Sequence, residues 1–134
     1  MFESVDHIGV AVDDLDASIK LYSELLEMPL EHRETVAEQG VEAALLGVGD
    51  SHVELLAPLA DDTPVGKFLA KRGPGMHHVA YAVDDLPASL AELEREVAEL
   101  IDLHPRQGLF GLEVAFVHPD AAHGVLAELV SDAG

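Results

Sequence analysis

The sequence contains no cysteine and no tryptophan, and only 4% of its residues are aromatic. Without cysteine the chain can form neither disulfides nor thiolate metal ligands, so imidazole and carboxylate are the strong ligand types that remain. Basic residues are scarce as well: 7 Lys and Arg stand against 26 Asp and Glu, for a formal net charge of -19. Nucleic acid and anionic membrane surfaces are therefore poor partners for this chain.

Long apolar segments are also missing. The chain has no uninterrupted apolar stretch of about 18 residues, and no basic start followed by a short apolar run and a cleavage site. We therefore expect a cytoplasmic protein. Its 134 residues, 49% of them hydrophobic, suffice for a single domain with its own core. Self-repulsion at this charge is screened over roughly 3 Å in molar salt, so we also expect adaptation to a salt-rich cytoplasm.

An internal repeat organises the chain. Residues 7–21 align with residues 78–92 at a constant offset of 71 (78 minus 7), with eight identities in fifteen positions. Each copy begins with alternating β-branched and small residues, which predicts a strand. Paired aspartates follow, Asp13 with Asp14 and Asp84 with Asp85, and aspartate at such a position can cap a helix. The repeat therefore predicts two similar halves.

Each predicted helix has one apolar face, because its apolar residues recur at i, i+4, i+7 and i+11. These residues are Leu15, Ile19, Tyr22 and Leu26 in the first half, and Leu86, Leu90, Leu93 and Val97 in the second. Short extended segments follow each helix: Glu31 to Val36, Val41 to Leu46, His52 to Leu56, then Glu99 to Leu103, Leu112 to Val117 and Gly124 to Val130. The pattern predicts one α+β domain of two tandem βαβββ modules, about 1–59 and 75–134. Their linker, 60–74, holds a candidate helix from Val65 to Arg72.

The first strand of each half places a histidine on a face of small residues. Alternate strand residues face opposite sides, so His7 shares its side with Gly9 and Ala11, and His78 shares its side with Ala80 and Ala82. The last strand of each half carries a glutamate among aliphatic residues, Glu54 or Glu128. A carboxylate in an inner strand is costly to bury unless it is paired, protonated or bound to a metal.

These four residues form the candidate metal site. A single strand histidine is usually a core or surface residue, and a single glutamate usually lies on an exposed face, but the duplication favours ligands. Two imidazoles and two carboxylates suit one divalent ion, with Co²⁺ preferred and Ni²⁺, Mn²⁺, Zn²⁺ or Fe²⁺ as alternatives, and leave positions for water or substrate oxygen. We expect the ligands to be His7, Glu54, His78 and Glu128.

Five segments carry a family resemblance: VDHIGVAV at 5–12, EQGV at 38–41, ELLAPL at 54–59, KFLAKRGPGMHHVAYAVDD at 67–85 and FVHPDAAHGVLAELV at 116–130. This ordered set resembles the vicinal oxygen chelate superfamily, and within it is most similar to the methylmalonyl-CoA epimerases. The resemblance implies a cup-shaped mixed sheet around a metal site, with His7, His78 and Glu128 among the ligands. It further implies an acyl-CoA substrate, a place in propionate metabolism and a homodimer.

Two positions depart from the pattern of that family. Glu54 stands where some epimerases carry a glutamine ligand, and Ala43 stands where some carry an inward carboxylate that acts as an acid/base group. Glu42 is adjacent, but the strand period turns it to the other face. We therefore expect Glu128 to be one acid/base group and Glu54 to supply the second.

Alternatives remain open at this point. Glyoxalase I, a relative with a His, Glu, His, Glu metal set, is one; a non-catalytic ligand-binding module of the same superfamily is another. The basic residues Lys67, Lys71, Arg72 and Arg106 could bind substrate phosphates, or could be an accident of the surface. We assign no role to the histidines that lack a repeated counterpart: His32, His52, His77, His104, His118 and His123.

Overall fold

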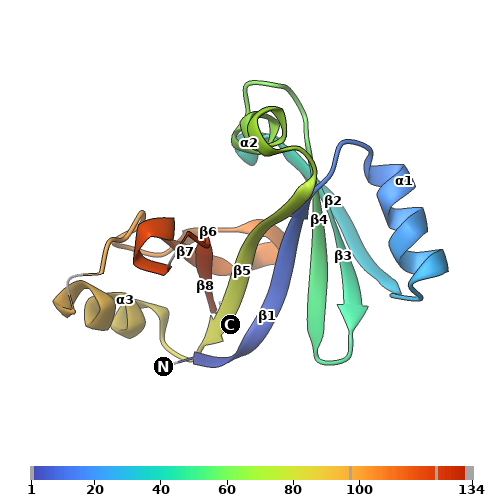
Figure 1. Cartoon of the computed structure of the whole chain (residues 1–134). Coiled ribbons are helices and arrows are strands. Elements are labelled where there is room, and N and C mark those ends of the chain that lie inside the picture. Colours follow the sequence, from blue (N-terminus) through green and yellow to red (C-terminus); the bar gives the residue numbers. More distant parts are fainter. Residues whose placement is uncertain (1, 97, 123, 132–134) are drawn as a thin grey trace. The chain divides into compact units, whose positions relative to one another are not determined.

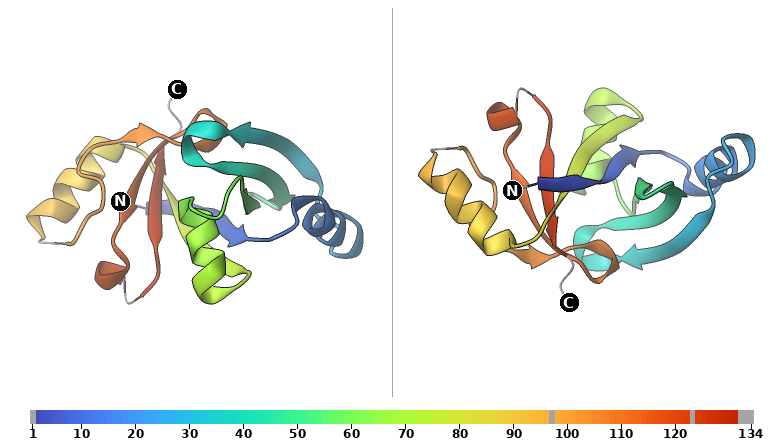
Figure 2. Two further views of the ribbon diagram at one scale, coloured as in Figure 1. Left: turned by 90° about the horizontal axis from the view of Figure 1, so that it is seen from above. Right: turned by 90° about the horizontal axis from the view of Figure 1, so that it is seen from below.

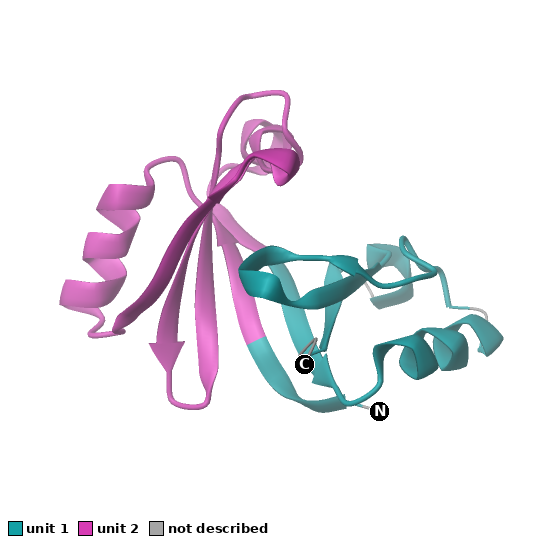
Figure 3. Cartoon of the chain, turned by 180° about the vertical axis from the view of Figure 1, so that it is seen from behind, with its two compact units in different colours: residues 1–6, 78–134 teal, residues 7–77 magenta. Residues whose placement is uncertain are grey.

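The computed structural model describes residues 2–96, 98–122 and 124–131. Three α-helices and eight strands lie in this part of the chain (Figure 1). The chain separates into two compact units, coloured in Figure 3: unit 1 comprises Met1–Asp6 and His78–Gly134, and unit 2 comprises His7–His77. No helix of the described residues is both long and apolar enough to cross a membrane.

Unit 2 contains the first βαβββ pattern. Its elements are β1 (Phe2–Ala11, from His7 onward), α1 (Leu15–Lys20), the π-helical turn η1 (Leu21–Leu25), β2 (Leu30–Val36), η2 (Ala37–Gln39), β3 (Val41–Val48), β4 (Ser51–Pro58) and α2 (Pro64–Arg72). The strand order is β2-β3-β4-β1. The β1 and β4 strands are parallel, and the β2/β3 and β3/β4 pairs are antiparallel. The strands predicted for this half and the helix predicted in the linker are confirmed, with ends shifted by one or two residues.

Unit 1 contains the second pattern. Its elements are β5 (Gly75–Val83, from His78 onward), α3 (Leu86–Arg95), β6 (Arg106–Gln107), η3 (Leu109–Gly111), β7 (Glu113–Val117), η4 (Pro119–Ala122) and β8 (Ala127–Ser131). The order β5-β8-β7-β6 has β5 parallel to β8 and the other neighbours antiparallel. Each half thus places its first strand parallel to its last strand, which confirms the α+β class with two βαβββ modules.

The helices begin where the paired aspartates predicted. The Asp14 carboxylate accepts a hydrogen bond from the Ala17 N–H at 3.0 Å, and the Asp85 carboxylate accepts one from the Ala88 N–H at 3.1 Å. Each aspartate satisfies an amide that has no partner within its helix. The second aspartate of each pair is therefore the N-cap.

The apolar face predicted for the first helix is wrong at its end. Leu15 is buried and Ile19 and Tyr22 pack beside it, but Leu26 is 50% exposed. The chain changes from α to π geometry after Lys20, with the Leu26 N–H donating to the Leu21 carbonyl at 3.1 Å. The wider π turn shifts the phase of the helix, so Leu26 turns outward. In the second helix Leu86, Leu90 and Leu93 contribute to the core as predicted, whereas Val97 lies outside the described residues.

Two predicted strands of the second half need correction. Residues 99–103 form only an isolated bridge, Leu100 to Val117. The Asp102 carboxylate accepts a hydrogen bond from the Phe116 N–H at 2.9 Å. In a longer strand pair this N–H would instead donate to a backbone carbonyl, so the side chain competes with strand pairing here. The last strand begins at Ala127 rather than Gly124, since the 3-10 turn from Pro119 to Ala122 precedes it and Gly124 has a φ of 93°.

Each unit has its own core between a helix and strands. Figure 2 shows α1 and α3 from above and below; α1 packs on β3 and β4, and α3 packs on β7 and β8. The core of unit 2 consists of Val12, Leu15, Ala44, Leu46, Leu55 and Ala57, and that of unit 1 of Val83, Leu86, Leu90, Ala115, Val117, Ala127 and Leu129. Leu55 of β4 and Leu129 of β8 belong to these cores, so the neighbouring Glu54 and Glu128 lie on the opposite face of their strands.

Candidate functional site

The first buried ionisable pair lies in unit 2, on β1 and β4. The parallel register sets Glu54 opposite Gly9, two residues after His7, so both side chains extend from the same face. His7 Nε2 lies 3.6 Å from Glu54 Oε2. His7 and Glu54 are only 3% and 4% exposed, so this carboxylate is almost entirely removed from water.

The second pair lies in unit 1, on β5 and β8, and repeats this arrangement. Glu128 is opposite Ala80, two residues after His78. His78 Nε2 lies 3.9 Å from Glu128 Oε1, and the two residues are 3% and 7% exposed. Among the described residues, buried ionisable side chains occur only in these two pairs. One histidine and one glutamate thus lie next to each other within each half.

The chemistry of the two pairs fits a divalent metal ion. Burial of a carboxylate without compensation costs several kcal/mol, roughly, and a nearby imidazole or a metal ion supplies that compensation. Neutral imidazole and carboxylate are also the ligands that Co²⁺, Ni²⁺, Mn²⁺, Zn²⁺ and Fe²⁺ accept. Each unit thus offers one buried imidazole nitrogen and at least one buried carboxylate oxygen as metal ligands. That all four residues bind the same ion stays a prediction.

Apolar side chains line the face that carries each pair. In unit 1 the His78 ring meets the edge of Phe116 at a centroid distance of 6.0 Å, and Phe116 is paired with Glu128 in the β7/β8 ladder. Ala80, Val114 and Val130 pack beside Phe116. Sequence reasoning did not select Phe116; its place opposite Glu128 follows from the antiparallel register, which sequence patterns leave open.

Ala43 lies on the same face of unit 2 as Glu54. In the β3/β4 ladder Glu54 is opposite Leu45, and Ala43 is two residues before Leu45 and fully buried. Glu42 faces the other side, where its carboxylate accepts the Arg33 Nε–H at 2.8 Å. This hydrogen bond and the one from Arg33 to Asp16 raise the pKa of the Arg33 guanidinium. The predicted orientation of Ala43 and Glu42 is confirmed, so Glu42 cannot serve as an acid/base group beside Glu54.

The four predicted phosphate-binding residues fall in two groups. Lys67, Lys71 and Arg72 are exposed on α2 of unit 2. Arg106 belongs to unit 1, where its guanidinium lies 3.3 Å from Asp102 and over the ring of Phe116 at 5.1 Å. Arg106 already has a carboxylate and an aromatic partner, whereas Lys67, Lys71 and Arg72 have no carboxylate partner among the described residues.

Three of the six remaining histidines have surface carboxylates as neighbours. His52 lies 2.9 Å from Glu31, and His32 lies 3.6 Å from Glu34. His118 is close to Glu99 and Asp120, a group of three candidate metal ligands at the surface, but its Nδ1 already accepts the Asp120 N–H at 3.1 Å. His104 is exposed, and His123 lies outside the described residues.

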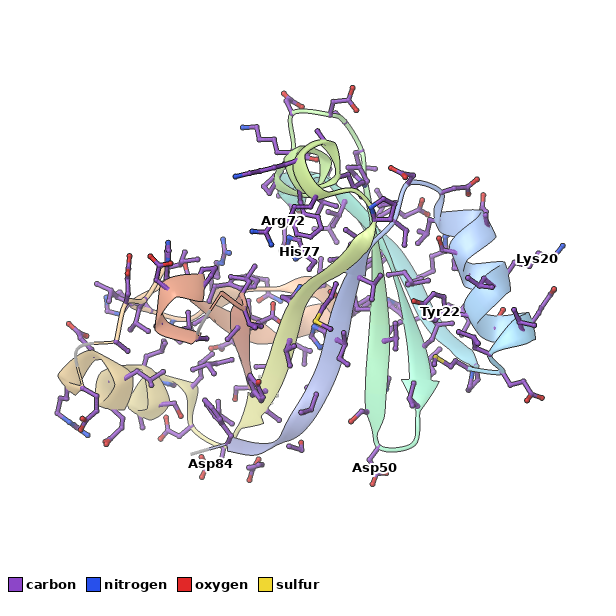
Figure 4. The ribbon with its side chains drawn as sticks, viewed as in Figure 1. Lys20, Tyr22, Asp50, Arg72, His77 and Asp84 are labelled. Carbon is purple, nitrogen blue, oxygen red and sulfur yellow. The ribbon has the colours of Figure 1, made fainter. Side chains whose placement is uncertain are left out.

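His77 differs from these surface residues. Its ring meets the edge of Phe68 at a centroid distance of 4.9 Å, and burial lowers the pKa of its imidazole. Figure 4 shows His77 next to Arg72, beneath α2. The packing of Phe68 with both residues was not expected from the sequence, although the spacing of Phe68 and Arg72 at i and i+4 could have indicated it.

Comparison with known proteins gives one superfamily. The model of the glyoxalase/bleomycin resistance protein/dioxygenase superfamily matches residues 6–116. YqjC, an uncharacterized protein of Bacillus subtilis, is 40% identical over 97% of this chain and 93% of its own. The mitochondrial methylmalonyl-CoA epimerase of Mus musculus is 33% identical over 93% of this chain and 71% of its own.

A solved structure extends this similarity to the fold. A methylmalonyl-CoA epimerase in complex with methylmalonyl-CoA and NH4+ has a TM-score of 0.93 and 38% identity, covering 100% of this chain and 97% of that one. A probable chloroplastic lactoylglutathione lyase of Arabidopsis thaliana is more distant: it is 30% identical over 74% of this chain, which covers 27% of that protein. The epimerases are thus similar to almost the whole chain, whereas the lyase is similar to less of it.

Proposed function

Because the chain belongs to the glyoxalase/bleomycin resistance protein/dioxygenase superfamily, we propose that it is an epimerase that interconverts (R)- and (S)-methylmalonyl-CoA. The observation that carries this proposal is the presence of equivalent buried His–Glu pairs in the two halves. They accompany 38% identity, over the full chain, to an epimerase structure that contains methylmalonyl-CoA.

His7, Glu54, His78 and Glu128 would hold one divalent ion. Support comes from the shared register of the two pairs, their shared burial and the absence of cysteine. When bound, the ion would supply electrostatic stabilisation of the enolate oxygen that develops as the C2 proton leaves. Co²⁺ is the preferred ion in this proposal, and Ni²⁺, Mn²⁺, Zn²⁺ and Fe²⁺ are its alternatives.

Two carboxyl groups would exchange the proton at C2. An ionised glutamate on one side removes the proton from carbon and leaves an enolate, and a protonated glutamate on the other side returns a proton to the opposite face. We assign Glu128 and Glu54 to these positions, because Ala43 cannot act as an acid/base group and Glu42 faces away from Glu54. Each glutamate needs one oxygen that is available to the substrate proton.

The apolar lining has a role in this scheme. Phe116 packs against the His78 ring and limits its rotation, so the imidazole nitrogen keeps its direction toward Glu128. Apolar neighbours also reduce local dielectric screening, which strengthens the interaction of charged groups with a developing enolate.

A proton exchange assay in D₂O tests the proposal. The purified protein is analysed for bound metal and then incubated with (S)-methylmalonyl-CoA, and C2 deuterium and the stereochemistry are followed together. We expect close to one metal per chain and incorporation of deuterium with inversion. A protein that contains metal but catalyses neither exchange nor inversion would refute the proposed reaction.

Two other functions make different predictions in this assay. A glyoxalase I would convert the hemithioacetal of methylglyoxal and a thiol to a thioester, and would leave methylmalonyl-CoA unchanged. Glu54 is the residue that favours it, since that enzyme uses two glutamate ligands. A non-catalytic module would bind its ligand with neither reaction, and metal-free purified protein would favour it.

A further inference from the structure

The helix α2 (Pro64–Arg72) holds an unusual concentration of positive charge. Three of the chain's seven basic residues, Lys67, Lys71 and Arg72, lie on it within six positions. All three are exposed. A chain with 26 acidic residues has ample carboxylates to pair with every basic side chain, so the partners of these three need examination.

Lys67, Lys71 and Arg72 have no carboxylate partner among the described residues, unlike the other arginines. Arg33 is paired with Glu42 and Asp16, Arg95 with Glu92, and Arg106 with Asp102. The remaining basic residue, Lys20, lies on α1 and likewise has no carboxylate partner in this part of the chain. Within the described residues, α2 thus carries three cations that have no carboxylate partner, in a strongly acidic chain.

Helix electrostatics account for only part of this group. Lys71 and Arg72 lie in the last turn of α2, where the helix dipole favours cations. Lys67 lies near the amino-terminal end, where the dipole favours anions, and the exposed Asp61 and Asp62 precede that end. Lys67 therefore needs another explanation, and it shares a helix face with Lys71 at i and i+4.

The guanidinium of Arg72 is positioned by aromatic packing. It lies 5.7 Å from the centroid of the Phe68 ring, whose edge meets His77. A cation–π contact of this kind leaves the guanidinium N–H groups available for hydrogen bonds to a ligand. Figure 4 shows the Arg72 side chain close to His77 at the start of β5. Arg72 is thus partly ordered before any ligand binds.

We propose that Lys67, Lys71 and Arg72 form the docking site for the phosphates at the adenosine end of the acyl-CoA substrate. Because the chain has a net charge of -19, it repels a polyanionic ligand unless cations are concentrated locally. Planar Arg hydrogen bonds and the two mobile ammonium groups suit phosphate oxygens. This inference rests on the proposed function for the identity of the thioester, but the phosphate contacts can be measured without catalysis.

Direct binding separates the two proposals. Calorimetric titration with CoA, dephospho-CoA, 3′,5′-ADP, pantetheine and inorganic phosphate is carried out on the metal-loaded protein, at the lowest salt concentration that keeps it folded. We expect wild-type protein to bind CoA and 3′,5′-ADP, and pantetheine much more weakly. The double variant Lys67→Gln/Lys71→Gln should weaken CoA binding by about tenfold or more, since it removes two charge-assisted contacts to phosphate.

The matched control is Lys20→Gln, which removes the exposed lysine of α1 and should leave the affinity for CoA unchanged. In turnover, the ratio of kcat/KM for methylmalonyl-CoA to that for methylmalonyl-pantetheine should fall in the double variant and stay constant in Lys20→Gln. Binding of CoA without epimerisation would refute the proposed function and retain the docking site. Epimerisation with equal CoA affinity in wild type and double variant would overturn the docking site alone.

Discussion

At the scale of single residues, the two glutamates determine what chemistry the chain can carry out. Each is nearly fully buried beside a histidine. Burial of a carboxylate without compensation costs roughly several kcal/mol, and the adjacent histidine or a metal ion supplies that compensation. The proposed proton transfer site with a bound ion would provide it.

The separate roles of the two glutamates are testable by isotope exchange. With two acid/base groups, Glu54→Gln should block inversion yet leave C2 proton exchange with solvent for one of the two epimers. Glu128→Gln should show the same behaviour for the other epimer. Loss of a general acid/base typically lowers a rate by about 10²–10⁴-fold. Deuterium incorporation and chiral analysis of recovered substrate distinguish these outcomes.

The control for this pair of variants is Glu42→Gln, since Glu42 lies one residue from Ala43 on the face that contacts Arg33. It should epimerise at the wild-type rate. Wild-type inversion by Glu54→Gln with metal bound would show that Glu54 is only a ligand, and the second acid/base group would then have to be sought elsewhere.

At the scale of secondary-structure elements, each half depends on a helix with a defined start. The Asp85 side chain caps α3, whereas the preceding Asp84 is exposed and lies outside the N-cap position. Asp85→Ala should lower the free energy of unfolding by about 1 kcal/mol, the usual contribution of an N-cap. Asp84→Ala should change it by less than about 0.5 kcal/mol. Urea denaturation of the two variants measures the difference, and equal losses would contradict the assigned cap.

The π turn after α1 gives a second prediction at this scale. Leu15→Ala should destabilise unit 2 by about 2–5 kcal/mol, because Leu15 is 5% exposed and its truncation leaves a cavity. Leu26→Ala should have an effect within about 0.5 kcal/mol, since Leu26 is half exposed. A regular α-helix would instead bury Leu26. Similar decreases in the free energy of unfolding for Leu15→Ala and Leu26→Ala would therefore contradict the π turn. Denaturant midpoints at constant m-value provide the measurement.

At the scale of the whole molecule, the excess of acidic residues governs stability in different salts. Few of the 26 acidic residues have a basic partner, because there are only 7 Lys and Arg. Raising KCl from 0.1 to about 2 M reduces the screening length from roughly 10 Å to less than about 3 Å. We expect the melting temperature to rise by about 4 °C or more, which corresponds to roughly 1 kcal/mol for a domain of this size.

Sucrose at matched water activity is the control for this melt, because it stabilises through exclusion from the surface without screening charge. If charge repulsion limits stability, KCl should raise the melting temperature more than sucrose does. A melting temperature that is constant across KCl concentrations would contradict both the repulsion and the predicted adaptation to a salt-rich cytoplasm.

The sequence alone determined the features that depend on local pattern or on repetition. The copies at 7–21 and 78–92 identified His7 with His78 as equivalent, and the matched carboxylates followed from the ends of the two halves. Helix starts were predictable because an aspartate cap acts within three residues, as the bonds to Ala17 and Ala88 confirm.

Only the tertiary structure decided the features that depend on pairing between distant residues. The registers that set Glu54 opposite Gly9 and Glu128 opposite Ala80 join strands far apart in the chain, and a shift of one residue would have turned each glutamate to the helix-facing side. The same holds for Phe116 against His78 and for the single bridge at Leu100. Side-chain periodicity names the residues that share a face, whereas packing between strands selects the partners across it.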